Sequence, residues 1–306
     1  MRRRVGELRG YTAILSASAL FGASATVGTL LLKNFGLNPI VGLVFAHGIA
    51  TVAFLPFARN AVPRRKDAPI ILAWGLNGAA LAPLLWFYGI SHTTATEAAL
   101  LANLEALFTV AFAYVFLKER VPRRGYLGIA ALLAGAVAVT TNFDFVSFGF
   151  TAHLLGNTLL ILSSCLFGID NNISRVLITR YDRRGIPFFK LWIGLAVVIP
   201  VSLVIGVPYA FSPSILGLAL FLGIGSVAGV MWFFYIAFQE IGAMRTGALI
   251  STSALFGVAI AYGVSQVIAG FSPPPTAVQL GGGLLMVAGT FLTSEWTPRL
   301  RRNRQG

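Results

Sequence analysis

The chain has 306 residues, of which 57% are hydrophobic and only 11% are charged, and its mean hydropathy is +0.81. Soluble domains carry about 25% charged residues, so this composition excludes a water-soluble fold, and lipid must cover the remaining apolar surface. The formal net charge of +13 comes from short basic clusters between long apolar runs, which excludes the continuous basic face of a nucleic-acid-binding protein.

Ten apolar runs are long enough to cross a bilayer, which takes roughly 20 residues. In chain order they cover residues 11–32, 38–57, 69–90, 95–117, 124–142, 152–177, 186–206, 213–236, 245–268 and 277–294. The linkers between them are short. The sequence therefore predicts an all-α integral membrane protein with ten transmembrane helices and without a soluble domain.

The first run follows Arg2, Arg3 and Arg4 and therefore imitates a secretory signal peptide. Its apolar stretch from Tyr11 to Leu32 is longer than a signal core of roughly 7–15 residues. It also has a counterpart later in the chain. We therefore expect it to be retained as the first membrane helix.

The distribution of Lys and Arg predicts the orientation of these helices. If the amino terminus is cytoplasmic and the runs alternate in direction, every Lys and Arg except Lys33 falls in a cytoplasmic segment. The sequence thus predicts a multi-pass protein of the plasma (cytoplasmic, or cell inner) membrane with both termini in the cytoplasm.

The chain also repeats itself. The Leu-Phe-Gly that ends at Gly22 recurs at Gly168, and an Ala-Leu-Phe-x-Val-Ala-x-Ala-Tyr block that begins at Ala106 recurs at Ala254. Each repeat holds five helices, an odd number, so the second must enter the membrane from the opposite side. Such inverted repeats are typical of secondary transporters with a solute site near the bilayer midplane. We predict two halves, residues 1–145 with the first five helices and residues 146–306 with the other five.

Two stretches carry a family resemblance. The run Asn-Leu-Glu-Ala-Leu-Phe from Asn103 to Phe108 continues to Leu-Lys-Glu-Arg at Leu117–Arg120. With the two five-helix halves, it resembles the EamA family of the drug/metabolite transporter superfamily over roughly residues 11–294. The resemblance implies export, or less often uptake, of amino acids or other small metabolites, generally without ATP. We expect a secondary transporter that works by alternating access.

Three positions depart from the pattern of that family. Ala106 stands where a proline is usual, and His47 stands where an arginine is common. In the second half, Ser253 occupies the position that corresponds to Glu105. Only the first half can therefore supply a carboxylate at this pair of corresponding positions.

Ionisable residues inside the runs call for an explanation, because a charge near the bilayer centre costs roughly 2.5–3.5 kcal/mol even on the lenient insertion scale. Glu105 is interpreted as a coupling carboxylate, with a helix-packing role as the alternative. Asp170 and Asn171 predict a polar gate or solute contact, with pairing to Arg175 or an amide network at the helix end as the alternative. His47 is either a proton carrier or a neutral hydrogen-bonding group between helices.

Asparagines and aromatic residues complete the candidate cavity. Asn77 and Asn103 are expected to hydrogen-bond to the solute. Trp-x-Tyr and Trp-x-x-Tyr pairs occupy like positions in the third and eighth runs and are interpreted as cavity residues, with an interfacial belt as the alternative. The candidate set is Glu105, Asp170, His47, Asn103, Asn77, Asn171, Trp86, Tyr88, Trp232 and Tyr235.

Nothing in the sequence supports an enzyme. The three histidines are far apart, Cys165 is the one cysteine, and no nucleotide, metalloprotease or hydrolase motif is present. We expect no catalytic residue, metal or cofactor. The expected partners are a small-molecule solute and the lipid bilayer. One chain should suffice, while a homodimer stays open.

Two other classes of function stay open as the alternative, a lipid-handling membrane enzyme and a scaffold. The former needs clustered catalytic side chains, and the latter has no need of a duplication. Glycines in the fifth and tenth runs, at Gly128, Gly135, Gly282 and Gly289, either form a dimer contact or pack within the fold, and we expect the second.

Overall fold

The computed structural model describes residues 2–29, 31, 35–93, 101–144, 152–209, 212–268 and 274–293. Within these ranges the chain forms helices and no β-strand. The first half contains α1 (Arg2–Thr29), α2 (Pro39–Ala58), η2 (Arg59–Ala61), η3 (Arg65–Asp67), α3 (Ala68–Leu76), η4 (Asn77–Leu81), α4 (Ala82–Ser91), α6 (Leu104–Val115) and α7 (Arg123–Thr141).

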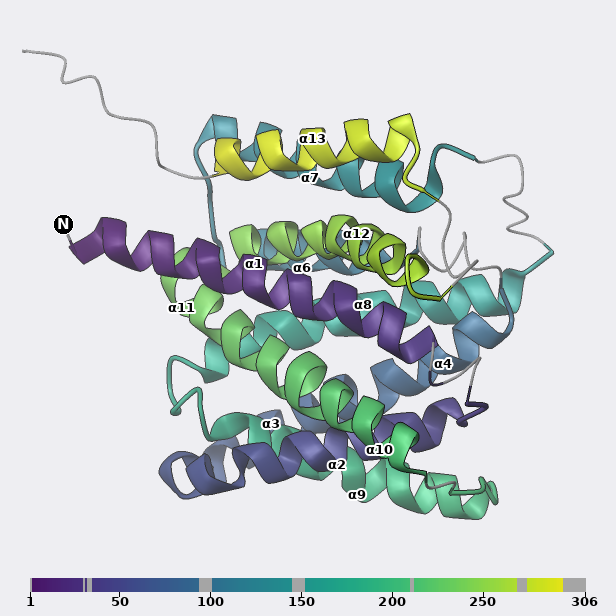
Figure 1. Cartoon of the computed structure of the whole chain (residues 1–306). Coiled ribbons are helices and arrows are strands. Elements are labelled where there is room, and N and C mark those ends of the chain that lie inside the picture. Colours follow the sequence, from purple (N-terminus) through teal and green to yellow (C-terminus); the bar gives the residue numbers. More distant parts are fainter. Residues whose placement is uncertain are drawn as a thin grey trace, which may run out of the picture.

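The second half of the chain is also built from α-helices and short π-helical and 3-10 segments. It contains α8 (Leu154–Leu177), α9 (Ile186–Val204), α10 (Pro213–Leu220), η5 (Phe221–Gly229), α11 (Val230–Leu249), η6 (Ile250–Thr252), α12 (Ser253–Ser265) and α13 (Ala277–Thr293). The helices lie in layers, with α7 and α13 at one edge of the bundle and α2, α3 and α9 at the opposite edge (Figure 1). The chain is thus an all-helical protein, as predicted.

Local sequence explains where two of these helices begin. The side chain of Asn38 accepts a hydrogen bond from the Ile40 N–H, and Pro39 occupies the first turn of α2. The hydroxyl of Ser212 accepts from the Ile215 N–H in the same way, again with a proline in the first turn. A polar cap followed by proline satisfies the free donors of a helix start and fixes its backbone.

Among the described residues, seven helical runs are long and apolar enough to cross a membrane, by length and composition. They are Val5–Gly28, Pro39–Ala61, Arg65–Gly89, Arg123–Thr141, Leu154–Leu177, Ile186–Val204 and Pro213–Ser265. Leu104–Val115 and Ala277–Thr293 are shorter apolar helices. Residues 94–100, in the predicted fourth run, lie outside the described part of the chain.

The predicted count of ten spans is not confirmed. The eighth and ninth predicted runs form one helical stretch of 53 residues, because the helix resumes directly after Gly242. Gly242 itself has φ 83° and ψ 170°, a conformation available to glycine and outside the helical region. A kink therefore separates the two runs where the sequence predicted a loop.

Two π-helical segments interrupt the third and eighth predicted runs. They are η4, from Asn77 to Leu81, and η5, from Phe221 to Gly229. A shift of 146 residues moves η4 into the range of η5. π-Helical turns are rare and occur frequently at functional sites. The two runs therefore have irregular backbone at corresponding depths.

Hydrogen bonds between helices recur in the two halves. Ser18 in α1 donates to the carbonyl of Leu249 at 3.3 Å, and Ser164 in α8 donates to the carbonyl of Leu101 at 3.1 Å. The two serines are 146 residues apart and the two leucines 148 residues apart. The same contact therefore joins α1 to the second half and α8 to the first half.

Close glycine contacts between helices also recur in the two halves. Gly22 packs directly on Phe256 and Gly257 of α12, so that a β-carbon there would lie 2.7 Å from the Gly257 nitrogen. Gly168 packs on Phe108 and Thr109 of α6, which stand 148 residues before Phe256 and Gly257. Small residues allow membrane helices to approach closely, and here they do so at matched positions.

The α7–α13 pair also packs through glycines. A β-carbon on Gly128 would lie 2.7 Å from the Gly289 carbonyl oxygen, and one on Gly289 would lie 2.7 Å from the Gly128 oxygen. Gly135 and Gly282 approach each other in the same reciprocal way. The prediction that these glycines pack within the fold is confirmed.

Candidate functional site

A buried ion pair links α8 to α9. Lys190 Nζ donates to Asp170 Oδ2 at 2.6 Å, and the two side chains are only 8% and 6% exposed. The sequence analysis assigned Lys190 to a cytoplasmic segment. Its position inside the predicted run 186–206 was the signal that could have identified it as an intramembrane charge.

The pair is enclosed by groups from the third helical run. Gly78 of η4 packs against the Asp170 carboxylate, which would overlap a β-carbon at this position. The ring of Trp74 lies 5.1 Å from Lys190 Nζ, within the range of a cation–π contact. Trp74 also donates through Nε1 to Ser174 Oγ at 2.9 Å. The local π-helix and an aromatic ring thus position both charges.

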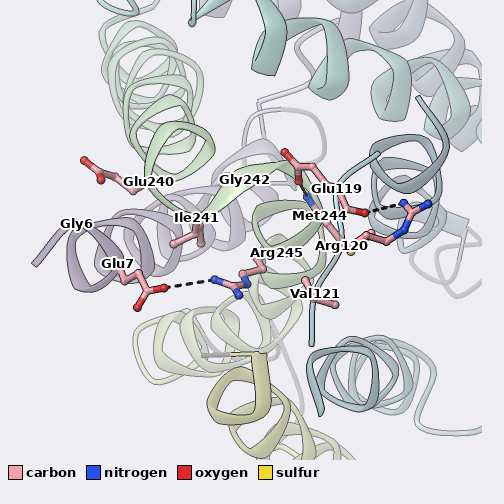
Figure 2. Close-up of a pocket in the computed structure, with 10 residues that line it drawn as sticks. All are labelled: Gly6, Glu7, Glu119, Arg120, Val121, Glu240, Ile241, Gly242, Met244 and Arg245. Atoms are coloured by element: carbon pink, nitrogen blue, oxygen red, sulfur yellow. Dashed lines mark hydrogen bonds and ion pairs between the residues drawn. The ribbon is translucent and has the colours of Figure 1, made fainter. Parts of the chain in front are cut away.

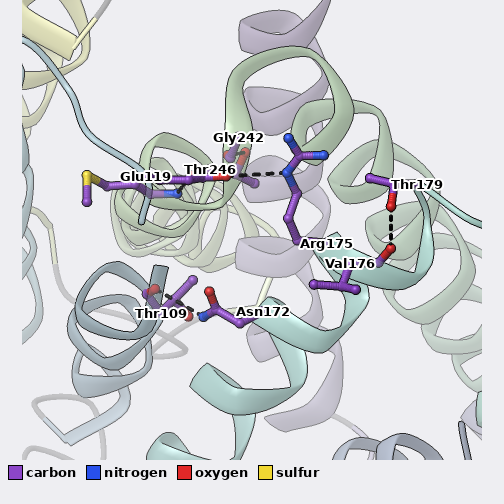
Figure 3. A network of polar contacts seen from close by, with 9 residues as sticks. Thr109, Glu119, Asn172, Arg175, Val176, Thr179, Gly242 and Thr246 are labelled. Carbon is purple, nitrogen blue, oxygen red and sulfur yellow. Dashed lines mark hydrogen bonds and ion pairs between the residues drawn. The ribbon is translucent and has the colours of Figure 1, made fainter. Parts of the chain in front are cut away.

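Glu105 belongs to a second set of contacts, between α6 and α8. Asn171 Nδ2 donates to Glu105 Oε1 and to Thr109 Oγ1, both at 3.0 Å. Asn172 donates to the carbonyl oxygen of Thr109 at 3.1 Å (Figure 3). It also donates to the carbonyl oxygen of Gly168 at 2.8 Å. The charges of Asp170 and Lys190 also act on Glu105. Asparagine side chains therefore connect the carboxylate of α6 to the helix that carries the ion pair.

Several buried polar atoms near this pair lack hydrogen-bond partners within the described ranges. They include Asp170 Oδ1 and His47 Nδ1. His47 is 8% exposed and lies within electrostatic reach of Lys190, as Tyr235 does of Asp170. Leaving such a group unsatisfied costs about 1–3 kcal/mol. The cluster therefore retains capacity to bind a polar molecule.

We call these residues the polar cluster, which contains His47, Glu105, Asp170, Asn171, Lys190 and Tyr235. Five of them belong to the candidate set from the sequence. The alternative pairing of Asp170 with Arg175 is wrong, because Arg175 binds Glu119. Lys190 occupies the position next to Asp170 instead.

The other five candidates lie elsewhere. Asn77 donates to the Leu166 carbonyl at 2.8 Å and borders an apolar groove of about 320 Å³. Asn103 donates to Thr140 of α7 at 3.1 Å. Trp86 packs against Leu101 and Leu160, Tyr88 is exposed, and Trp232 packs on Phe57 with 5.9 Å between ring centroids.

A group of charged residues closes one end of the bundle. Arg245 pairs with Glu7 at 3.7 Å, and both side chains are nearly buried, at 11% and 13% exposure. They line a cavity of about 360 Å³ together with Glu119 and Arg120 (Figure 2). Arg9 pairs with Glu240 at 3.6 Å. These pairs join α1 to α11 at what we call the charged end.

Glu119 ties together three further segments at the charged end. Its Oε2 accepts from the Met244 N–H at 2.9 Å, and its Oε1 accepts from Arg175 Nε at 3.4 Å (Figure 3). Figure 3 shows Gly242 directly beside the Glu119 carboxylate. Glu119 therefore connects the α6–α7 link to α8 and to the kink of α11.

The link between α8 and α9 lies against the start of the third run. Tyr181 donates to Asp67 Oδ2 at 2.6 Å, and Arg180 pairs with Asp67 at 3.2 Å. Burial, assisted by this hydrogen bond, raises the pKa of Tyr181 above its usual range. Tyr181 therefore stays neutral and remains a hydrogen-bond donor at physiological pH.

Comparison with known proteins shows a family resemblance over the first part of the chain. Residues 8–141 match the model of the EamA-like transporter family. An uncharacterized transporter of Methanothermobacter thermautotrophicus is 29% identical over 94% of this chain and 86% of its own. The pseudopaline exporter CntI of Pseudomonas aeruginosa is 27% identical over 82% and 84%, and the probable terminal-alkyne amino-acid exporter of Streptantibioticus cattleyicolor is 27% identical over 78% and 77%.

A solved structure shares the fold. A chain described simply as the crystal structure of a protein aligns over 97% of this chain and 100% of its own, with a TM-score of 0.75 and 19% identity. The predicted resemblance to the EamA family is confirmed. The protein is a multi-pass membrane protein, and the names of its relatives are those of transporters.

Proposed function

We propose that this EamA-like transporter is a secondary transporter that exports a small metabolite, an amino acid or a similar compound, by alternating access. Two relatives support export, since one is named for a terminal-alkyne amino acid and the other for pseudopaline. The observation that carries the proposal is the polar cluster, which holds buried charges among helices of both halves.

The proposal divides the chain into two inverted halves, residues 1–145 and 146–306, each with five membrane helices. The recurring contacts of Ser18 and Ser164, and of Gly22 and Gly168, support this division. So do the two π-helical segments at corresponding positions. In proteins of this architecture, one half rocks against the other around a site near the midplane.

The proposed site is the polar cluster. Glu105 lies ten residues before the end of α6, about 15 Å along a helix, which is half of the hydrocarbon thickness. We assign coupling to its carboxylate, which takes up a proton on one side and releases it on the other. Asp170, His47 and Asn171 contact the solute beside it.

The charged end is the proposed cytoplasmic barrier. The Lys and Arg distribution supports a cytoplasmic position for this end and for both termini at the plasma membrane. The pairs Glu7–Arg245 and Glu119–Arg175 hold this end closed. Opening toward the cytoplasm separates these pairs, and a single chain suffices because both halves are fused.

The test is a metabolite profile of cells and medium with and without the protein, followed by flux in reconstituted vesicles. We expect at least one small metabolite to accumulate in the medium only when the protein is present, and vesicles to move it with a proton gradient. Glu105→Gln should abolish the pH-driven flux. If no metabolite changes and no vesicle flux appears, the proposal is wrong.

A further inference from the structure

We propose that the Lys190–Asp170 ion pair is the solute-binding element, and that it selects zwitterions, solutes with both an ammonium and a carboxylate group. On binding, the solute carboxylate replaces Asp170 at the Lys190 ammonium, and the solute ammonium replaces Lys190 at the Asp170 carboxylate. This inference rests on the proposed transport function and adds the residues that bind the solute and the charge pattern that they select.

The first argument is the placement of the pair. Lys190 and Asp170 bond to each other at 2.6 Å with almost no exposure, yet they belong to different helices. The two charges can therefore separate when α8 and α9 move relative to each other. Two charges in direct contact form the internal equivalent of a bound zwitterion.

The second argument is hydrogen-bonding capacity that the pair leaves unused. An ammonium has three donors, and the described structure gives Lys190 Nζ one hydrogen-bond acceptor, Asp170 Oδ2. Asp170 Oδ1 is buried without a partner, as is His47 Nδ1. A solute ammonium would satisfy Asp170 Oδ1, and a solute carboxylate would take up the free donors of Lys190.

The third argument concerns the backbone beside the two charges. Asp170 lies against Gly78, where any side chain would overlap its carboxylate. Gly78 belongs to the π-helical segment η4, and π-helical turns occur frequently at functional sites. Irregular backbone without a side chain therefore packs directly against the carboxylate.

Charge balance then selects the class of solute. Breaking a buried pair by removing one partner is strongly unfavourable, because one charge stays buried and unpaired. A zwitterion separates the pair without leaving either charge alone. A solute with a single charge leaves the charge of either Lys190 or Asp170 without a counter-charge. The energetic cost of that unpaired charge, and not the shape of the site, excludes such a solute.

A purely structural ion pair is the competing explanation, and charge-neutral variants distinguish the two. The variants are Asp170→Asn, Lys190→Met and the double variant, with Asp67→Asn/Arg180→Met as the matched control at another ion pair between helical segments. The probes are L-leucine, isopentylamine and 4-methylpentanoate, and the corresponding set L-phenylalanine, 2-phenylethylamine and 3-phenylpropionate. Binding to purified protein is measured as ligand-induced thermal stabilisation and by calorimetry.

We expect the wild type and the control variant to bind at least one of the two amino acids about tenfold or more tightly than its singly charged analogues. Lys190→Met should shift the preference toward the amine, and Asp170→Asn toward the carboxylate. The double variant should lose the preference for zwitterions altogether. If the single variants do not fold, the double variant, which leaves no charge unpaired, decides the question.

Two results would overturn the inference. One is a double variant that binds the amino acids with the wild-type preference, which would make the pair structural. The other is a wild type with no preference for either amino acid over its singly charged analogues. Failure of the transport proposal looks different, since no metabolite would then be exported, whereas export of a singly charged metabolite would contradict this inference alone.

Discussion

The carboxylate of Glu119 accepts a hydrogen bond of 2.9 Å from the backbone N–H of Met244, which lies 125 residues further along the chain. Gly242 breaks the helix just before Met244, so this N–H is among the unpaired donors at the start of a new helical stretch. A carboxylate at such a position satisfies a donor and interacts favourably with the helix dipole. One residue of the first half thus stabilises a helix start in the second.

Replacing Glu119 should therefore lower stability. We expect Glu119→Ala to reduce the free energy of unfolding by about 1–2 kcal/mol, the range for loss of a helix cap with its dipole interaction. Denaturation of the purified protein in detergent measures the change. The control is Glu240→Ala, whose pair with Arg9 is more exposed and is expected to contribute about 0.2–1 kcal/mol. Equal losses for both variants would contradict the capping role.

Gly242→Ala should destabilise the protein by about 1–3 kcal/mol, because its φ of 83° is accessible to glycine and strained for alanine. A β-carbon there would also lie 2.9 Å from Glu119 Oε2. The same denaturation assay serves, with Gly217→Ala as the control. Gly217 is helical with open space around it, so alanine there should be neutral or stabilising by up to about 1 kcal/mol.

The matched helix contacts predict matched effects. Gly22→Leu and Gly168→Leu should each destabilise by about 1–3 kcal/mol, because each inserts a side chain into backbone of the opposite half. Gly28→Leu, at a position with no neighbour within 4 Å, should change little. Thermal unfolding of the three variants provides the comparison. If only one of the first two is destabilised, the contacts are not equivalent.

The buried ion pair predicts non-additive stability. Lys190→Met should lower the free energy of unfolding by about 3–5 kcal/mol by leaving Asp170 unpaired, and the double variant with Asp170→Asn should recover much of this loss. A double-mutant cycle of the unfolding free energies measures the coupling. Additive losses would show that the two side chains act independently.

The sequence predicted the helices whose ends carry clear local signals. It did not predict the π-helical segments or the kink at Gly242. The run 38–57 matches Pro39–Ala58, since an asparagine cap and a proline mark its start. The π-helices and the kink at Gly242 depend on neighbouring helices and have no local signal of comparable strength. A single glycine among small apolar residues does not indicate a positive φ.

The candidate site was likewise predicted in part. Glu105 and Asp170 stood out because charges are rare inside apolar runs, and the structure brings both into the polar cluster. Lys190 was grouped with the loop arginines because it lies close to the start of its helix. Tyr88 was grouped with Tyr235 by repeat position, yet it lies exposed while Tyr235 is buried. Which face of a helix is buried depends on its neighbours, and repeat position alone does not fix it.

The most direct test of the transport account is the reactivity of introduced cysteines in native membranes. In a Cys165→Ser background, cysteines are placed at Glu105, Asp170 and Lys190, and for comparison at Val52 and Leu284, which are exposed on apolar membrane helices. Asp170 and Lys190 are buried in this structure and Glu105 is partly buried. Alternating access predicts that these three polar-cluster positions react with a water-soluble thiol reagent while the two apolar positions do not. If the polar-cluster cysteines are as unreactive as those at Val52 and Leu284, no water-accessible pathway passes through the cluster, and the account is contradicted.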